Sequence, residues 1–374
     1  IGLKLEETDG RFQATLPSWR PDLTREVDVW EEVARLLDFD KLPATLPLPP
    51  IRRQAPPPAW RLREEARDHL TFRGFSETIA YSFLNPNFAD KLGLGPDSPW
   101  RARLLPILNP LSQDQGVMRS LLAPGLLTAL KLNQNHGRRE ATLFEVGVTF
   151  LSNGLNRQPE EKQTIAGLWA GLVGSGRWND QERPVDFWDI KGVVEGLAEH
   201  FNLEVSFSRA EDLPPWYSPS EAAFVNLEGG RRLGHLGRLN RKAVKAFGLK
   251  DSLGAVYLFE LDGDEILARG LTRPPFKHWS KFPQVERDMA LVLDKNIPAA
   301  EVSAVIKAEK GLPLTGVFIF DLYEGDQLPE GKKSLAFRLT FQDEERTLTD
   351  EEVNRHFNVI TEKMNSRFDA TLRS

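Results

Sequence analysis

The chain contains no cysteine among its 374 residues. Disulfide bonds, thiolate nucleophiles and cysteine-based zinc sites are therefore excluded, and a reducing compartment is the simplest setting. No apolar run approaches the roughly 18 residues that a membrane-spanning helix needs, and no secretory signal pattern is visible. We therefore expect a cytoplasmic protein without a membrane partner.

Signatures of catalysis and nucleotide binding are also missing. The 6 histidines are scattered, and none stands at metal-ligand spacing from another. No Ser/His/Asp set can be defended, and no P-loop is present. Residues 170–176 (AGLVGSG) are rich in glycine but lack the G-x-G-x-x-G order and a following helix, which favours a plain loop over a phosphate site. We therefore name no catalytic residue.

Positive charge is not in excess either. With 48 Lys and Arg against 54 Asp and Glu, the net charge is −6. Charge alone gives no support for nucleic-acid binding, so any RNA contact must come from local basic clusters. A hydrophobic share of 40% and a length of 374 residues indicate two to four folded domains. Because the chain begins at Ile1, without Met and partway into an element, we expect a fragment of a longer protein.

Residues 18–37 (SWRPDLTREVDVWEEVARLL) predict a turn followed by an amphipathic helix. Pro21 is expected at the entry, and Asp22 can cap the free amides of the first turn. Apolar residues recur at three- and four-residue steps and form one stripe. The members of this stripe are Leu23, Val27, Trp30, Ala34 and Leu37.

The other side of this helix is acidic, with Asp28, Glu31 and Glu32 on adjacent turns. Carboxylates at this spacing repel each other unless a cation meets them. One interpretation is a solvated surface that Arg25 and Arg35 partly compensate. The other is a site for a hard cation, because carboxylate oxygens are ligands that Mg²⁺ prefers. The spacing leaves both interpretations open.

Residues 20–36 (R-P-D-L-T-R-E-V-D-x-x-E-E-V-A-R-L), followed by D-F-D-K-L-P-A-T-L-P, resemble the beta subunit of bacterial phenylalanyl-tRNA synthetase. In that family, acidic residues of this helix bind Mg²⁺ where the beta subunit contacts the alpha subunit. The resemblance assigns this role to Asp22, Asp28, Glu31 and Glu32.

The middle of the chain follows a connector with seven prolines between Pro43 and Pro58. We expect helices at 60–73, 187–201 and from Pro124, strands at 75–86, 141–151 and 164–173, and a hairpin at 222–239 that turns at Gly229–Gly230. The runs Asn109–Leu122 and Leu143–Gly147 resemble the same family. The resemblance implies an antiparallel class II synthetase-like module without activity, and no G-x-G-x-G-x-R run is present. Two expected loops, at 217–220 and 237–241, depart from the family pattern.

Residues 276–374 predict the order strand, helix, strand, strand, helix, strand, which is a ferredoxin-like arrangement. The predicted elements are Arg287–Leu293, Ala299–Lys310, Thr315–Tyr323, Ser334–Phe341, Asp350–Phe368 and Ala370–Arg373. Thr349 and Glu352 have the spacing of a capping box at the last helix.

Several runs in this last region, among them F-P-Q-V-E-R-D-M-A-L-V-L-D and R-T-L-T-D-E-E-V-N, resemble the ferredoxin-fold anticodon-binding domain of the same beta subunit. Aromatic residues on the sheet could stack on bases. The basic residues expected to contact RNA are Arg287, Lys332, Lys333, Arg338, Arg346 and Arg373.

The sequence thus predicts an α+β, multidomain chain. Its expected parts are the end of a small Mg-binding module (1–46), a proline-rich linker (47–59), a class II synthetase-like module (60–275) and a ferredoxin-like domain (276–374). The resemblance implies a beta-subunit fragment of an ATP-dependent phenylalanine–tRNA ligase, with two alpha and two beta subunits, that binds tRNA(Phe) and neither charges nor edits alone. A free-standing RNA-binding or regulatory paralogue is the alternative.

Overall fold

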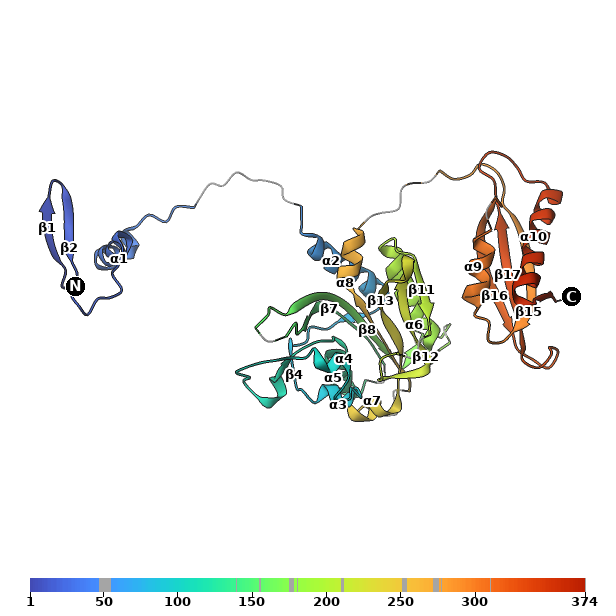
Figure 1. The fold of residues 1–374 in the computed structure, drawn as a ribbon, viewed down its shortest axis with the longest axis horizontal. Coiled ribbons are helices and arrows are strands. Elements are labelled where there is room, and N and C mark those ends of the chain that lie inside the picture. The colour runs from blue at the N-terminus through green and yellow to red at the C-terminus, as the bar shows by residue number, and fades with distance from the viewer. Residues whose placement is uncertain are drawn as a thin grey trace. The chain divides into compact units, whose positions relative to one another are not determined.

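The structure is a computed structural model that describes residues 1–46, 55–138, 140–154, 156–174, 178–179, 181–209, 212–250, 254–271, 276, 278–309 and 311–373. The chain forms two compact units, Ile1–Leu271 and Thr272–Ser374 (Figure 1). Part of the predicted linker (47–54), the end of the glycine-rich stretch (175–176) and residues 272–275 beside the predicted domain boundary lie outside the described residues. No helix in the described ranges is long and apolar enough to cross a membrane.

The N-terminal segment is a hairpin followed by one helix. Strands β1 (Lys4–Thr8) and β2 (Arg11–Thr15) pair antiparallel. Their turn places Asp9 and Gly10 at φ of 52° and 72°. Helix α1 (Glu26–Leu37) and the 3₁₀ turn η1 (Phe39–Lys41) follow.

Two expectations for α1 are wrong. Asp22 does not cap the helix, because α1 begins four residues later, and Asp28 instead accepts hydrogen bonds from the amides of Thr24 and Arg25. The apolar stripe does not form the buried face: Leu23 is buried, but Trp30 is 64% exposed, and Glu32 is the buried residue within α1. The buried face of α1 is the face on which Glu32 meets arginine side chains.

A seven-stranded sheet is the centre of the first unit. Its order is β11-β12-β13-β14-β8-β7-β3. All neighbours are antiparallel except β3 and β7. The strands are β3 (Ser76–Glu77), β7 (Ala141–Leu151), β8 (Glu160–Ala170), β11 (Val205–Ser208), β12 (Tyr217–Leu227), β13 (Arg232–Leu239) and β14 (Val256–Asp262). The predicted strand at 141–151 and the hairpin that turns at Gly229–Gly230 are confirmed.

Helices cover both faces of this sheet, because alternate side chains along each strand point into two different apolar cores. On β14, Tyr257 and Phe259 belong to the core under α2 (Pro58–Phe72), α6 (Phe187–His200) and α8 (Gly263–Arg269). Val256 and Leu258 belong to the core under α3 (Phe88–Lys91), α5 (Ala123–Asn135) and α7 (Arg241–Ala246). The predicted helices at 60–73, from Pro124 and at 187–201 are therefore confirmed, apart from their ends.

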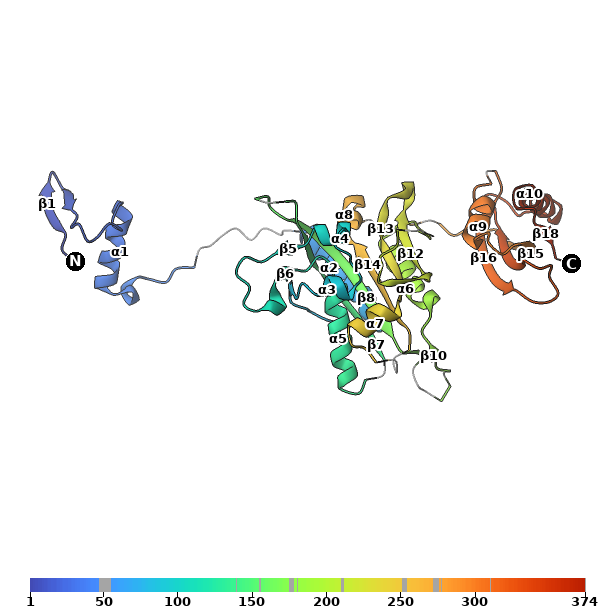
Figure 2. The ribbon, with the colours of Figure 1, turned by 60° about the horizontal axis from the view of Figure 1, so that its bottom comes forward.

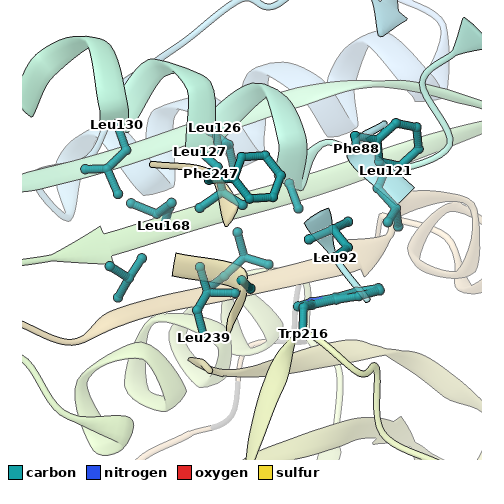
Figure 3. Packing of buried hydrophobic residues seen from close by; sticks show 14 of the residues in the cluster. Phe88, Leu92, Leu121, Leu126, Leu127, Leu130, Leu168, Trp216, Leu239 and Phe247 are labelled. Atoms are coloured by element: carbon teal, nitrogen blue, oxygen red, sulfur yellow. The ribbon is translucent and has the colours of Figure 1, made fainter. Parts of the chain in front are cut away.

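Figure 3 shows from close by the core that α3, α5 and α7 cover. Leu126, Leu127 and Leu130 of α5 lie over Leu168 of β8, and all four are essentially inaccessible to solvent. Trp216, which precedes β12, is fully buried in the same cluster.

The predicted strand at 75–86 is wrong over most of its length. The chain pairs with β7 at Ser76–Glu77 and then leaves for a second, three-stranded sheet. That sheet has the order β4-β6-β5, with β4 at Phe83–Leu84, β5 at Leu105–Pro106 and β6 at Val117–Met118. Because the segment changes sheets, residues 79–82 have no continuous strand partner.

The remaining short elements of the first unit are α4 (Pro99–Ala102), η2 (Gln113–Gln115), β9 (Leu172–Val173), β10 (Arg183–Pro184) and η3 (Glu228–Gly230). The two stretches that depart from the family pattern are not loops as expected. Residues 217–220 lie within β12, and most of 237–241 belongs to the end of β13 and the start of α7. These departures from the family pattern therefore change side chains of β12, of β13 and of the start of α7.

The second unit has the predicted β-α-β-β-α-β order. Its elements are β15 (Val285–Asp294), α9 (Ala299–Lys307), β16 (Leu314–Tyr323), β17 (Lys332–Phe341), α10 (Asp350–Phe368) and β18 (Thr371–Leu372). The sheet order is β16-β17-β15-β18. Residues of α9 and α10 share one apolar core with alternate strand residues, so both helices cover the same face (Figure 2).

The predicted capping box at α10 is confirmed. The Thr349 hydroxyl accepts a hydrogen bond from the amide of Glu352 at 3.3 Å, and the Glu352 carboxylate accepts one from the amide of Thr349 at 3.0 Å.

Candidate nucleic-acid interface and acidic helix

The face of the C-terminal sheet away from the helices carries aromatic and charged side chains. In antiparallel sheets, directly opposite residues point to the same side. Phe318 of β16 lies opposite Arg338 of β17, which lies opposite Asp288 of β15. Phe318 is 66% exposed and Phe320 is 46% exposed. We call this surface the open face.

A shift in register shapes the open face. The pairing of β16 with β17 moves by one residue between Ile319 and Asp321. Beyond this bulge, Tyr323 lies opposite Ser334 and therefore shares the open face with Phe318.

Two arginines lie over rings of the open face. The guanidinium carbon of Arg338 is 5.3 Å from the centroid of the Phe320 ring, and that of Arg373 is 4.5 Å from the centroid of Tyr323. Arg373 is held beside β15 because its amide donates to the carbonyl of Ala290 at 2.9 Å. Aromatic rings with neighbouring cations are the combination that binds single-stranded RNA, through base stacking and phosphate contacts.

Arg338 is balanced by carboxylates. Its Nε is 2.9 Å from Asp288 and 3.6 Å from Glu286. Hydrogen bonding from Arg338 lowers the pKa of the Asp288 carboxyl below its ordinary value. Both partners in the close pair are more than 40% exposed, and such surface pairs contribute little to stability. A phosphate can therefore compete for this guanidinium.

Three of the other predicted RNA residues lie away from the open face. Arg287 bonds Asp350 at 2.7 Å, and Arg346 bonds Glu352 at 2.9 Å, so both hold the N-terminus of α10. Lys333 donates to the carbonyl of Lys295 at 3.0 Å. Lys332, the first residue of β17, lies opposite Asp294. Because side chains alternate along a strand, it is on the same side of the sheet as Ser334 and Arg338, which is the open face.

Sequence reasoning did not name Phe318, Phe320 or Tyr323 individually. The signal was present in the run VFIFDLY, where aromatic residues alternate along a strand. The bulge that selects which of them share one side was not visible in that run. The structure thus brings Arg338, Arg373 and Lys332 to the open face. It assigns Arg287 and Arg346 to the end of a helix.

Arginine side chains occupy the acidic side of α1. Arg20 Nη2 is 2.7 Å from Asp22 and 2.6 Å from Glu32. Glu32 also accepts a hydrogen bond from Arg35 at 2.5 Å. Hydrogen bonds from Arg20 and Arg35 lower the pKa of the Glu32 carboxyl, and those from Arg20 lower the pKa of Asp22.

Asp28 binds backbone amides at the start of α1. One of its oxygens accepts hydrogen bonds from the amides of Thr24 at 2.8 Å and Arg25 at 2.7 Å, which lowers the pKa of this carboxyl. Glu31 is exposed on the helix surface.

The four predicted metal ligands therefore do not converge. Among the described residues, no group of three or more Asp, Glu, His or Cys is placed to hold a metal ion. Mg²⁺ needs near-octahedral oxygen ligands, whereas the oxygens of Asp22, Asp28 and Glu32 already accept from arginine or amide N–H groups. In this arrangement the residues do not fit the ion.

Three charged residues are buried inside the seven-stranded module. Arg119 Nη1 is 2.5 Å from Glu145, and its other donors reach the carbonyls of Ala80 and Val148. Burial raises the pKa of Glu145 in spite of this pair. Glu260 of β14 accepts from the amides of Leu122 at 3.2 Å and Ala123 at 3.2 Å, at the N-terminus of α5.

Burial raises the pKa of Glu260 to about 7, against the lowering effect of the two amides and Arg119. Perturbed carboxyl groups of this kind occur both in active sites and in structural networks. Here the carboxylate caps a helix end under a packed core, so its role is structural.

Comparison with known families covers each part of the chain. Residues 1–39 match the tRNA synthetase B5 domain, and residues 280–373 match the ferredoxin-fold anticodon binding domain. Residues 42–263, more than half of the chain, match the phenylalanyl tRNA synthetase beta chain CLM domain. The chain belongs to the phenylalanine–tRNA ligase beta-subunit family.

Curated relatives agree with this assignment. The phenylalanine–tRNA ligase beta subunit of Moorella thermoacetica is 38% identical over 98% of this chain and 45% of its own length. That of Syntrophotalea carbinolica is 35% identical over 100% of this chain and 46% of its own length. The chain thus spans about half the length of the beta subunits that it matches.

Among solved structures, pyrrolysyl-tRNA synthetase from Desulfitobacterium hafniense has a TM-score of 0.44 and 14% identity, over 57% of this chain and 69% of that chain. This likeness is too weak to carry an argument. The beta-subunit assignment depends on the family matches and the curated relatives.

Proposed function

We propose that this chain is the part of a phenylalanine–tRNA ligase beta subunit that binds the anticodon region of tRNA(Phe) and holds an alpha subunit. The complete enzyme would attach phenylalanine to tRNA at the expense of ATP, as two alpha and two beta subunits in the cytoplasm. The observation that carries the proposal is the open face, with two arginines over aromatic rings, in the unit that matches an anticodon-binding family.

RNA binding through the open face has a defined test. Phe318→Ala should weaken binding of a tRNA(Phe) transcript to the 374-residue chain, because stacking of one base on an aromatic ring contributes about 1–3 kcal/mol, or roughly 5- to 150-fold in affinity. Arg338→Gln should weaken binding and also reduce its dependence on salt, since a phosphate contact releases counterions. Both effects are measured by fluorescence anisotropy over a salt series.

Matched controls separate the open face from general effects. Phe72→Ala removes a phenylalanine that is 92% exposed on the other unit, and Arg346→Gln removes an arginine that is tied to the capping box of α10. Both control variants should bind as the unmodified chain does. Equal losses in Arg338→Gln and Arg346→Gln would count against the open face as the RNA surface.

Assembly with an alpha subunit is supported by exposed apolar residues beside the three-stranded sheet. Leu108 and Leu111 are 96% and 94% exposed, and Ile79 and Tyr81 are also exposed. Residues 79–82 lead into β4, and residues 107–116 connect β5 to β6, so one small sheet carries both segments. Large contiguous apolar patches mark interaction surfaces, and these four residues are the proposed members of such a patch.

The partner surface is tested by co-purification with the cognate alpha subunit. The double variant Leu108→Ser/Leu111→Ser should lose the mixed complex, whereas Leu132→Ser, at an exposed leucine of α5, should keep it. Retention of the complex by the double variant would move the alpha-subunit contact away from these two leucines.

We also propose that the chain alone does not activate phenylalanine. Apolar side chains of α5, together with Phe247 after α7, pack in one buried cluster with Leu168 of β8 (Figure 3), which supports a structural module. ATP–pyrophosphate exchange with phenylalanine and Mg²⁺ should therefore stay at background for the isolated chain. Robust exchange would contradict the proposal. The free-standing paralogue has no observation in its favour, since the matched relatives are named beta subunits.

A further inference from the structure

The acidic side of α1 already contains its own cation. Arg20 lies in the loop before the helix, and its Nη2 atom is shared between Asp22 at 2.7 Å and Glu32 at 2.6 Å. Its Nε atom adds contacts of 3.0 and 3.1 Å to both oxygens of Asp22. The guanidinium therefore joins the loop to a residue twelve positions further along the chain.

The geometry makes this pair stronger than an ordinary surface contact. The side chain of Glu32 is 11% exposed and that of Arg20 is 20% exposed, so water screens the pair only in part. The fork of an arginine also binds carboxylates with several parallel hydrogen bonds, which a lysine cannot do. Arg35 adds a second guanidinium on the other oxygen of Glu32.

The other two carboxylates do not make up a metal site. Asp28 is committed to the amides of Thr24 and Arg25, and Glu31 is exposed beside the pair. A divalent ion would have to take Asp22 and Glu32 from Arg20 and also lose part of its own water shell, which Mg²⁺ does reluctantly.

We infer that Arg20 is the resident cation of this segment: its guanidinium occupies the space between Asp22 and Glu32 and excludes a divalent metal ion from it. Loop and helix are then held by an internal ion pair, and a divalent ion can bind Asp22 and Glu32 only after Arg20 has been removed or withdrawn. This inference is independent of the proposed RNA and alpha-subunit contacts, because it concerns residues 20–35 alone.

The test is a titration with Mn²⁺, followed by electron paramagnetic resonance, on the complete 374-residue chain. The unmodified chain should show no stoichiometric site that depends on Glu32. Arg20→Gln should bind Mn²⁺ at least about tenfold more tightly, and Arg20→Gln/Glu32→Gln should lose the gain. Arg25→Gln is the matched control, because it removes one charge from the same segment and touches Asp28 only at 3.5 Å.

Each result decides the inference. A gain in Arg20→Gln that is absent from Arg25→Gln supports it. Equal Mn²⁺ affinity in the unmodified chain and Arg20→Gln overturns it. If Arg20→Gln does not fold, the unmodified chain still decides: one tightly bound Mn²⁺ that Glu32→Gln abolishes would overturn the inference, and the absence of such a site would support it.

Discussion

Glu260→Gln should change how the stability of the first unit depends on pH. The carboxyl of Glu260 is buried at the N-terminus of α5, where it accepts hydrogen bonds from the amides of Leu122 and Ala123. Glutamine has nearly the same shape and keeps one oxygen that can accept these bonds, but it does not titrate. The variant thus removes the ionisation of Glu260 and leaves the packing in place.

The direction of the pKa shift determines whether the free energy of unfolding rises or falls with pH. Burial raises the pKa of Glu260 from 4.5 to about 7, so between these values the folded chain binds more protons than the unfolded chain. The free energy of unfolding therefore falls as pH rises through this range. Within this range the free energy of unfolding changes by about 1.4 kcal/mol for each pH unit. Over the whole interval between the two pKa values it changes by about 3 kcal/mol. At pH 8 the variant should be more stable than the unmodified chain by this amount, and at pH 4.5 nearly equal to it.

The assay is urea unfolding between pH 4.5 and pH 8, followed by fluorescence of the tryptophans in the first unit. Glu221→Gln is the control: although burial alone would raise the pKa of Glu221, Arg238 and Tyr257 hold it below its ordinary value. Glu221→Gln should lower the free energy of unfolding by a constant amount above about pH 5.5, because the stabilisation by Glu221 is lost only as pH falls through its ordinary pKa of 4.5 and below. A constant difference between the unmodified chain and Glu260→Gln at every pH would refute the reasoning.

Three further substitutions test a buried ion pair, a close contact between strands and a helix cap. Arg119→Met leaves the buried carboxylate of Glu145 without its cation and should cost about 3–5 kcal/mol in urea unfolding at pH 8. Gly234→Ala places a new methyl group 2.2 Å from the backbone oxygen of Glu260, and its melting temperature in calorimetry should fall well below that of the unmodified chain. Thr349→Ala removes the cap of α10 and should cost about 1 kcal/mol in chemical unfolding of the second unit.

Local patterns predicted the C-terminal unit well. Thr349 and Glu352 stand at capping-box spacing, and the strand and helix periods are regular over six elements, so local and tertiary preferences agree. Around α1 they do not agree. Periodicity identified the two sides of the helix, but it carried no information on the loop residue that meets Glu32.

The strand expected at 75–86 shows another limit. Its residues have strand character throughout, but a sequence pattern does not specify where a chain leaves one sheet for another. The same limit applies to the predicted RNA-binding residues. In the sequence Arg338 and Arg346 are both isolated basic residues, and only their neighbours in the structure distinguish them. One lies over an aromatic ring, and the other holds a helix end.

The bulge in β16 makes chain length, as well as side-chain identity, a determinant of the open face. If Phe320 paired regularly and the strand had no bulge, Leu322, in place of Tyr323, would lie opposite Ser334. A deletion of Phe320, the extra residue, would keep Tyr323 opposite Ser334 and would remove the ring under Arg338. Homologous units that differ by one residue in this strand would therefore present different chemistry to a ligand, even with every other position conserved.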